Sequence, residues 1–242
     1  MKLSFIGIGS AFSDDVNNSA YIKKGENMLL IDCGETVFSE IKRNGLLEDL
    51  NNLFVFITHT HSDHIGSLSS LIHYMHYVKN KKVHLVYGNN YKIKNDIETL
   101  LKINGNNNEQ YDFVMAEDAK KYLGLEDISL FEVKHSPNLH SYAIRLGKVN
   151  GNGELENIYF TGDCCDKEFL KVILKDKHLN KIYCDVSLYG GVHLAYDDAT
   201  QIFEKYKDKV CFMHLENGFI KNRLKATGFD YAKQGVNYTY EK

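Results

Sequence analysis

Residues 53–64 read Leu53-Phe54-Val55-Phe56-Ile57-Thr58-His59-Thr60-His61-Ser62-Asp63-His64. The apolar run 53–57 predicts a buried strand, and three histidines and one aspartate follow directly after it. Imidazole and carboxylate groups suit a borderline divalent ion such as zinc, and four of them exceed what one tetrahedral site would take from so short a loop. This stretch therefore predicts a strand that leads into a site for two metal ions.

The three histidines have a competing structural interpretation. A lone histidine at a strand end is more often a hydrogen-bonded structural residue than a ligand. Three neighbouring imidazoles would repel one another if protonated, whereas a metal needs them deprotonated and convergent. The spacing predicts that His59 and His61 point one way, while Asp63 and His64 face a neighbouring ion.

Composition narrows the class of protein. The 242 residues are 43% apolar and 25% charged, with a formal net charge of -3, which is ordinary for a soluble globular protein with a substantial core. We expect a single domain that covers residues 1–242. Because the net charge is small and no basic block is present, long nucleic acid is an unfavoured partner, and a small anionic substrate is easier to accommodate.

Cysteine usage and the N-terminus predict a cytoplasmic protein. The five cysteines are odd in number and lack paired metal-type spacing. Cys164 and Cys165 lie beside Asp163 and could bind metal, but packed free thiols are the preferred interpretation. Residues 1–5 lead straight into a strand rather than a signal peptide, and no apolar segment approaches the ~18–20 residues that span a bilayer. Membrane insertion is not expected.

Apolar periodicity predicts an α/β chain. Apolar runs of strand length, bounded by turn residues, predict strands at 3–6, 19–22, 28–31, 53–57, 83–87, 128–134, 141–146, 158–161, 182–185 and 210–213. Helical spacing of apolar residues predicts helices at 36–46, 65–77, 90–103, 166–175 and 197–206. The Gly7-Ile8-Gly9 turn has no third glycine at dinucleotide-binding spacing, so a nucleotide cofactor is not expected.

Further ligand candidates follow other apolar strands. In α/β folds functional side chains gather beyond the carboxyl ends of strands. His135 follows the run 131–134, Asp163 follows 158–162, and His214 follows 210–213. Together with the first motif, these three residues predict a larger metal site.

The whole set resembles the metallo-β-lactamase superfamily and its αββα sandwich: His-x-His-x-Asp-His is followed by His135, Thr161-Gly162-Asp163 and His214. The resemblance implies that one metal is bound by His59, His61 and His135, that the second is bound by Asp63, His64 and His214, and that Asp163 bridges both. It also implies that Asp32, in Leu30-Ile31-Asp32-Cys33-Gly34, supports the ligands from behind.

One ligand has an alternative. His140 lies five residues after His135 and could replace it. We prefer His135, because it ends an apolar strand whereas His140 begins the next one. The other histidines are expected to be structural or surface residues: His73, His76, His84 and His178.

Such a site implies hydrolysis, since two ions about 3.5–4 Å apart can activate a water and clamp a phosphate. Diiron oxygen-reducing members usually carry Glu where this chain has His61, so redox chemistry is disfavoured. Thioesterases and lactonases typically carry Thr-Pro-Gly-His-Thr, where this chain has residues 133–138, Val-Lys-His-Ser-Pro-Asn. The segments 5–10, 30–34 and 141–145 instead resemble tRNase Z-like phosphodiesterases.

That branch also places a histidine before a late helix, and residues 192–199 resemble this segment. The resemblance implies that His193 contacts the scissile phosphate or protonates the leaving alkoxide. The alternative is a solvent-exposed residue at a helix N-terminus. Asp63 and His193 are therefore the candidate catalytic residues.

tRNA-processing members carry a long basic arm, and between Arg145 and Ile158 we find only a short hairpin-like turn. A compact tRNase Z-like chain without the arm resembles phage anti-Pycsar phosphodiesterases. The resemblance implies hydrolysis of cyclic CMP, UMP, AMP or GMP to linear nucleotides, which would evade cyclic-nucleotide antiphage signalling. It also implies two divalent ions, zinc or else manganese, and a homodimer. The alternatives are an RNA 3′-end processing endonuclease and a metal-dependent nucleotide sensor without catalysis.

Overall fold

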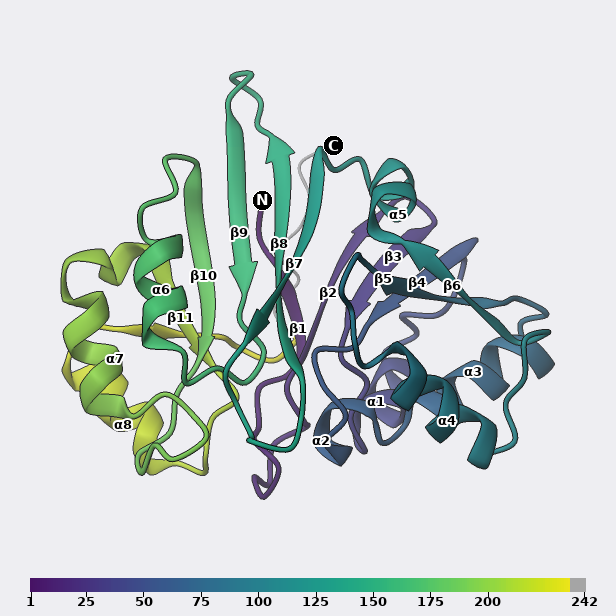
Figure 1. Ribbon diagram of the computed structural model, residues 1–242, viewed down its shortest axis with the longest axis horizontal. Helices are drawn as coiled ribbons and strands as arrows, with labels where there is room; N and C mark the ends of the chain where they lie inside the picture. The colour runs from purple at the N-terminus through teal and green to yellow at the C-terminus, as the bar shows by residue number, and fades with distance from the viewer. Residues whose placement is uncertain (236–242) are drawn as a thin grey trace.

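The computed structural model describes residues 1–235 and contains two β-sheets packed face to face, with helices along their outer sides (Figure 1). One sheet comes from the N-terminal half of the chain and the other from the C-terminal half. The predicted αββα arrangement is therefore present. No helix within residues 1–235 is long and apolar enough to cross a membrane.

The first sheet joins six strands in chain order: β1 (Ser4–Gly7), β2 (Ser19–Lys24), β3 (Asn27–Ile31), β4 (Asn52–Phe56), β5 (Val83–Tyr87) and β6 (Tyr111–Met115). β1, β2 and β3 are antiparallel neighbours, whereas β3 through β6 run parallel. Parallel strands need crossover connections, and the helices between them supply these. All carboxyl ends of β3 to β6 consequently point to one edge.

The second sheet repeats this scheme with β7 (Asp127–Val133), β8 (Ser141–Val149), β9 (Leu155–Phe160), β10 (Leu179–Asp185), β11 (Val210–Met213) and β12 (Asp230–Tyr231). Here β7, β8 and β9 are antiparallel, and β9 through β12 run parallel. Because β7 and β9 both oppose β8, the strands β7, β9, β10 and β11 all end at the same edge.

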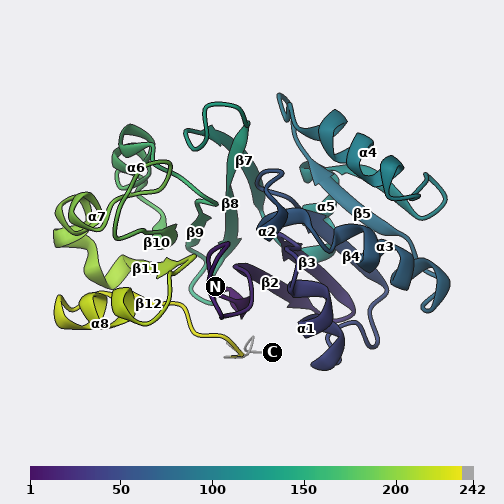
Figure 2. The ribbon, with the colours of Figure 1, turned by 90° about the horizontal axis from the view of Figure 1, so that it is seen from below.

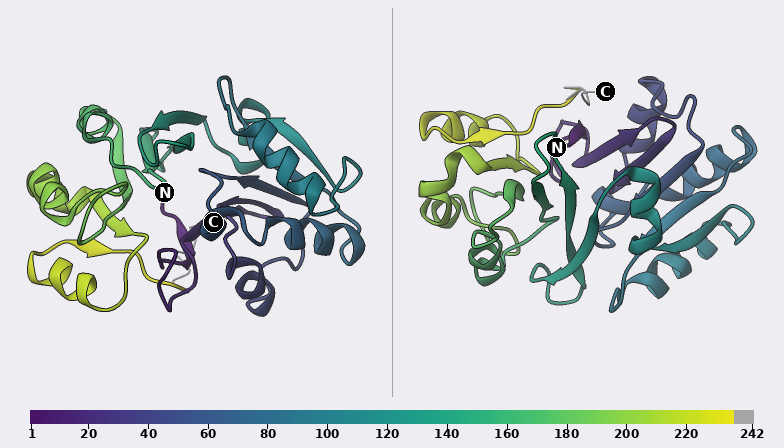
Figure 3. Two further views of the ribbon diagram at one scale, coloured as in Figure 1. Left: turned by 60° about the horizontal axis from the view of Figure 1, so that its bottom comes forward. Right: turned by 90° about the horizontal axis from the view of Figure 1, so that it is seen from above.

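The helices cover the sheets in two groups (Figures 2 and 3). The first half contributes α1 (Val37–Arg43), α2 (Ser62–Ile65), α3 (Leu68–Tyr77), α4 (Lys94–Ile103) and α5 (Ala116–Leu123). The second half contributes α6 (Lys167–Ile173), α7 (Tyr196–Phe203), the 3₁₀ helix η1 (Glu204–Lys209) and α8 (Phe219–Ala226). Helix α5 contacts strands of the first sheet and also β7, so it links the two halves.

The core lies between the sheets and beneath the helices. The run 53–57 is at most 2% exposed along its whole length, because its strand is covered on both faces and has no polar side. Phe5 of the first sheet packs on Phe160 and Tyr183 of the second, with ring centroids 6.4 and 5.3 Å apart. These aromatic side chains join the two sheets.

Replacing Phe160 with alanine should lower the free energy of unfolding by about 3–5 kcal/mol, because a fully buried ring is removed and the sheets cannot close the cavity. Urea unfolding followed by circular dichroism measures the effect. Phe160→Leu, which keeps most of the volume, should cost clearly less. Equal losses for both variants would contradict a cavity as the cause.

Several predicted elements differ from the structure at their ends. The segment predicted as one helix at 65–77 contains the end of α2 and all of α3, because the helix is interrupted at Gly66–Ser67. The helix predicted at 197–206 ends at Phe203 and continues as η1. Four elements of the structure were not predicted from the apolar pattern: β6, α5, α8 and the two-residue β12. Tyr111–Met115 is a partly exposed strand with mixed residues, so its apolar signal is weak.

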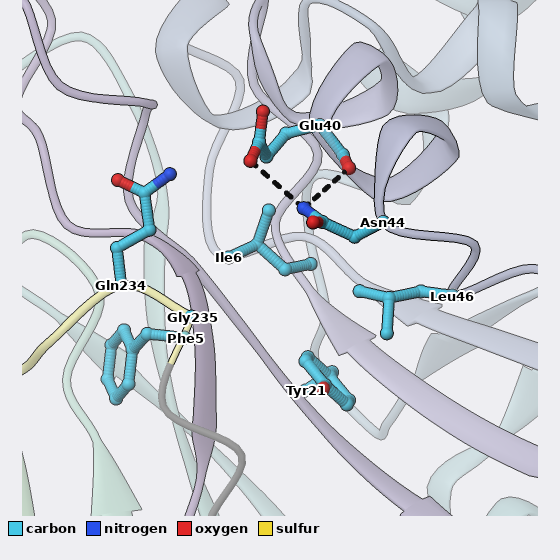
Figure 4. A pocket seen from close by; sticks show the side chains of 8 residues that line it. All are labelled: Phe5, Ile6, Tyr21, Glu40, Asn44, Leu46, Gln234 and Gly235. Carbon is cyan, nitrogen blue, oxygen red and sulfur yellow. Dashed lines mark hydrogen bonds between the residues drawn. The ribbon is translucent and has the colours of Figure 1, made fainter.

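A pocket of about 500 Å³ lies between β1, β2, α1 and the segment Gln234–Gly235 (Figure 4). On one side of the pocket, the Asn44 side chain donates hydrogen bonds to the backbone carbonyl and the carboxylate of Glu40. None of the eight lining residues belongs to the predicted metal site.

Candidate metal centre

All predicted ligands lie just beyond the ends of strands at one edge of the sandwich, the edge seen in Figure 2; Asp63 and His64 belong to the short helix α2 and the others to loops. The segment 59–64 follows β4 of the first sheet. His135, Asp163 and His214 follow β7, β9 and β11 of the second sheet. Because these strands share one direction, their carboxyl ends meet, and residues from both halves of the chain converge.

One group of candidate ligands consists of His59, His61, His135 and Asp163. His59 Nε2 and His135 Nε2 lie 3.0 and 3.2 Å from His61 Nδ1. Both Nε2 atoms also lie near Asp163 Oδ2, at 3.7 and 3.6 Å. The ligand atoms of the four residues all lie within 4.8 Å of one another, which is compact enough to surround one ion.

A second group consists of Asp63, His64 and His214. His64 Nε2 and His214 Nε2 face each other at 3.3 Å, and Asp63 Oδ2 lies 3.3 and 3.1 Å from them. Asp163 Oδ1 approaches the same two nitrogens at 3.4 and 3.5 Å. Asp163 thus turns one oxygen toward each group, which is the position of a bridging ligand.

The ring nitrogens that face away from the cluster make hydrogen bonds that orient His64 and His135. His64 Nδ1 lies 2.8 Å from Asp32 Oδ2, and Asp32 Oδ1 accepts a hydrogen bond from the Thr58 backbone at 2.7 Å. His135 Nδ1 donates to the Val192 carbonyl at 2.9 Å. A ring that donates from Nδ1 presents a lone pair at Nε2, here toward the centre of the site.

One buried atom shows directly that this group of residues fits a cation. Asp163 is 1% exposed, and its Oδ1 has no hydrogen-bond partner. A buried carboxylate oxygen without a partner is costly. A divalent ion held by the five imidazoles and two carboxylates of the site would be a partner for this oxygen.

The local electrostatics favour the metal-binding protonation states of three histidines and of Asp163. At His64 burial lowers the pKa, but the carboxylates of Asp163 and Asp32 outweigh it and raise the pKa. Burial lowers the pKa of His59, His61 and His135, and neighbouring imidazoles lower it further, so these rings are neutral at pH 7. Burial raises the pKa of Asp163, but the adjacent His214 and His64 outweigh it and hold the pKa well below its usual range. Neutral imidazole and ionised carboxylate are the forms that bind metal.

Two residues at the site have left-handed backbone conformations. Asp32 has φ of 63° and His214 has φ of 56°. Non-glycine residues rarely adopt this region, and such strain costs of order 1–3 kcal/mol where surrounding structure holds it. Backbone hydrogen bonds from Asp32 to Phe56 and from Leu215 to Ile8 hold the two segments.

The structure places His140 outside the cluster. Its side chain is 48% exposed, and its Nδ1 lies 2.7 Å from Glu132. His135, by contrast, is buried and faces Asp163. The histidines at 73, 76, 84 and 178 belong to neither group. The assignment of seven ligands remains a prediction, with a geometry that suits it.

His193 lies beside the metal ligands rather than in open solvent. It sits in the loop before α7, and its Nδ1 lies 3.7 Å from Asp163 Oδ2. The same nitrogen lies 3.1 Å from Asp185 Oδ2, and Asp185 is fully buried at the end of β10. Asp185 was not among the predicted site residues, although it follows the apolar residues 182–184 just as the other candidates follow their strands.

Comparisons with known proteins agree with this geometry. A family model described as "Anti-Pycsar protein Apyc1" matches residues 1–238. The protein of that name from Bacillus phage vB_BsuM-Goe3 is 29% identical over 265 residues, covering 97% of this chain and 96% of the relative.

Solved structures match the fold. The metallo-β-lactamase fold protein YhfI from Bacillus subtilis superposes with a TM-score of 0.70 at 16% identity, covering 97% of each chain. The short form of human tRNase Z gives 0.65 at 14% identity, covering 98% of each chain. The predicted metallo-β-lactamase fold is confirmed.

Proposed function

Because the chain belongs to the anti-Pycsar protein Apyc1 family, we propose that it hydrolyses cyclic mononucleotides, such as cyclic CMP, UMP, AMP and GMP, to linear nucleotides. At the coarser level it is a metallo-hydrolase with the metallo-β-lactamase fold. The finer proposal includes the biological role in the family's name: removal of a cyclic nucleotide that signals phage infection.

The observation that carries the proposal is the position of Asp163 between two groups of ligands, with His193 beside it. Two bound divalent ions would supply an activated water and a positive clamp for a phosphate. A cyclic mononucleotide presents one phosphodiester with a single negative charge, so it suits such a clamp. Water adds its oxygen to phosphorus, and the ester oxygen that leaves must gain a proton.

His193 is placed to deliver that proton. Its side chain is 25% exposed, and with Asp163 and His214 it makes up a third cluster of residues that could hold a metal. The hydrogen bond to Asp185 fixes the ring and favours its charged form. Asp63, our other candidate catalytic residue, lies among the ligands and acts by holding metal.

Three finer properties belong to this proposal. Zinc is the proposed resident ion, with manganese as the alternative, because imidazole-rich sites suit zinc. The proposed assembly is a homodimer, which light scattering after gel filtration would measure. The proposed compartment is the cytoplasm, in keeping with five free cysteines, four of them buried.

The direct experiment is incubation of the purified protein with the four cyclic nucleotides and added zinc or manganese, followed by chromatography of the products. We expect linear nucleotide from at least one of them. Precursor tRNA serves as the second substrate, since the connection between β8 and β9 is only residues 150–154 and offers RNA little to hold. Cleavage of tRNA alone would favour the RNA-processing alternative, and binding without turnover would favour a sensor.

Asp185→Asn should lower turnover by about 10–100-fold, the usual effect of removing a partner that orients a functional histidine. Burial lowers the pKa of His193, but the hydrogen bond to Asp185 and the charge of Asp163 outweigh it and raise the pKa. A general acid works only while protonated, so kcat falls as pH rises through that pKa. Without the charge of Asp185 this fall should occur at lower pH.

The pH profile of kcat measures that shift, with Asp118→Asn on the surface of α5 as the matched control. A profile of Asp185→Asn that is lower but unshifted would mean that Asp185 supports the fold rather than the charge of His193.

A further inference from the structure

Two aromatic side chains stand out on the surface of the described part of the chain. Phe12 is 97% exposed and Tyr189 is 89% exposed, and among the large apolar side chains that the structure describes, which leave out Phe219, no other exceeds 76%. Single exposed apolar residues are common and need no explanation. These two differ because both lie in turns attached to the residues that follow His214.

The turn that carries Phe12 is bonded to this segment from one side. The Ser10 amide donates to the Leu215 carbonyl at 3.1 Å. Asn217 Oδ1 accepts from the Ser13 hydroxyl and the Asp14 amide, both at 3.0 Å. Phe12 therefore lies one residue from an anchor, Ser13, in the segment between β1 and β2, which is the purple loop at the lower edge of Figure 1.

The turn that carries Tyr189 is bonded to the same segment from the other side. Glu216 accepts hydrogen bonds from the Ser187 hydroxyl at 2.6 Å and the Leu188 amide at 3.4 Å. Farther along, the Val192 carbonyl accepts from His135. This loop thus runs from Glu216 to a metal ligand, with Tyr189 at its exposed end.

The two anchors are consecutive residues, Glu216 and Asn217, and His214 comes just before them. Adjacent Cα atoms are ~3.8 Å apart, so the two aromatic-bearing turns are anchored side by side, two and three residues after a candidate metal ligand. The remaining strongly exposed apolar residues belong to other parts of the molecule, such as Tyr77 and Ile103 at the ends of α3 and α4.

We propose that Phe12 and Tyr189 form the binding site for the nucleobase of the substrate, by stacking on it while the metals hold the phosphate. This inference rests on the proposed function, since it names the part of the same site that takes the base. An aromatic face binds any base through its π surface, and it presents no hydrogen-bonding pattern that distinguishes one base from another. The enzyme should therefore accept purines and pyrimidines alike.

The test compares substrates with and without a base. Phe12→Ala and Tyr189→Ala should each lower kcat/KM for cyclic AMP by about 5- to 100-fold, mainly through KM, as expected for loss of one stacked base. Ribose 3′,5′-cyclic phosphate without a base should be hydrolysed as fast by the variants as by the parent protein. Phe12→Trp and Tyr189→Phe should restore the parent KM for cyclic AMP.

A binding measurement removes the dependence on turnover. The fluorescence of 2-aminopurine riboside 3′,5′-cyclic monophosphate should be quenched by the parent protein and by Tyr77→Ala, which truncates an aromatic residue that is 72% exposed elsewhere. The two site variants should quench it less.

The experiments distinguish failure of the proposed hydrolase function from failure of the proposed stacking site. If the parent protein hydrolyses neither substrate, the proposed function fails and this inference with it. If it hydrolyses cyclic AMP and the base-free compound equally well, or if the variants lose both activities equally, only the stacking site is wrong. A change from dimer to monomer in the variants with unchanged KM would likewise overturn it, by showing that the aromatic residues contact a second copy of the chain.

Discussion

Asp163→Asn should lower the rate of cyclic-nucleotide hydrolysis by more than about 100-fold. Loss of a residue that only hydrogen-bonds to a metal ligand costs ~10–100-fold in activity, and we expect loss of a ligand itself to cost more. Asp163 is the residue whose two oxygens approach both groups of ligands, Oδ2 near His59 and His135 and Oδ1 near His64 and His214. An amide keeps the shape but loses the charge and offers one oxygen instead of two. Both ions should therefore bind more weakly.

Metal content measured by plasma mass spectrometry should fall together with activity. The rise in Tm that zinc produces in the parent protein should shrink in Asp163→Asn, because ligand binding to the folded state adds stability that increases with the logarithm of the affinity. Asp118→Asn, a surface substitution of the same type, should match the parent protein in each respect. Unchanged metal content with full activity would remove Asp163 from the ligand set.

His193→Ala should lower kcat for cyclic nucleotides by about 10²–10⁴-fold, the range that a general acid contributes. Its ring lies 3.7 Å from Asp163 Oδ2 and 3.1 Å from Asp185 Oδ2, beside the ligands. A nitrophenolate leaves without needing a proton. The variant should therefore hydrolyse bis(p-nitrophenyl) phosphate far better than cyclic AMP, each compared with the parent protein.

Equal losses on the two substrates would contradict a proton-donating role and would indicate that His193 binds metal or phosphate instead. His140→Ala is the matched control, because His140 is half exposed and paired with Glu132. It should retain parent activity. A large loss in that variant would return His140 to the list of ligands.

Much of the architecture could be predicted from sequence because it depends on local patterns. The run 53–57 has no polar side, which marks a strand covered on both faces. Most other strands carry the same signal, and their ends locate His135, Asp163 and His214. Tyr111–Met115 was missed because most of its residues are only partly buried. The helix after it buries Ala116, Ala119 and Leu123 at helical spacing, but two of these three are alanines, so its apolar signal is weak.

The sequence by itself determined the chemistry of the centre: imidazole and carboxylate residues after apolar strands, and with them a metallo-hydrolase. Only the tertiary structure decided which of these residues contact one another and in what geometry. It turned the two oxygens of Asp163 to different groups, paired His193 with Asp185, and set His140 against Glu132. It also anchored Phe12 and Tyr189 beside the same segment. Such contacts join residues up to about two hundred positions apart, and their geometry depends on how two sheets pack, which no local pattern contains.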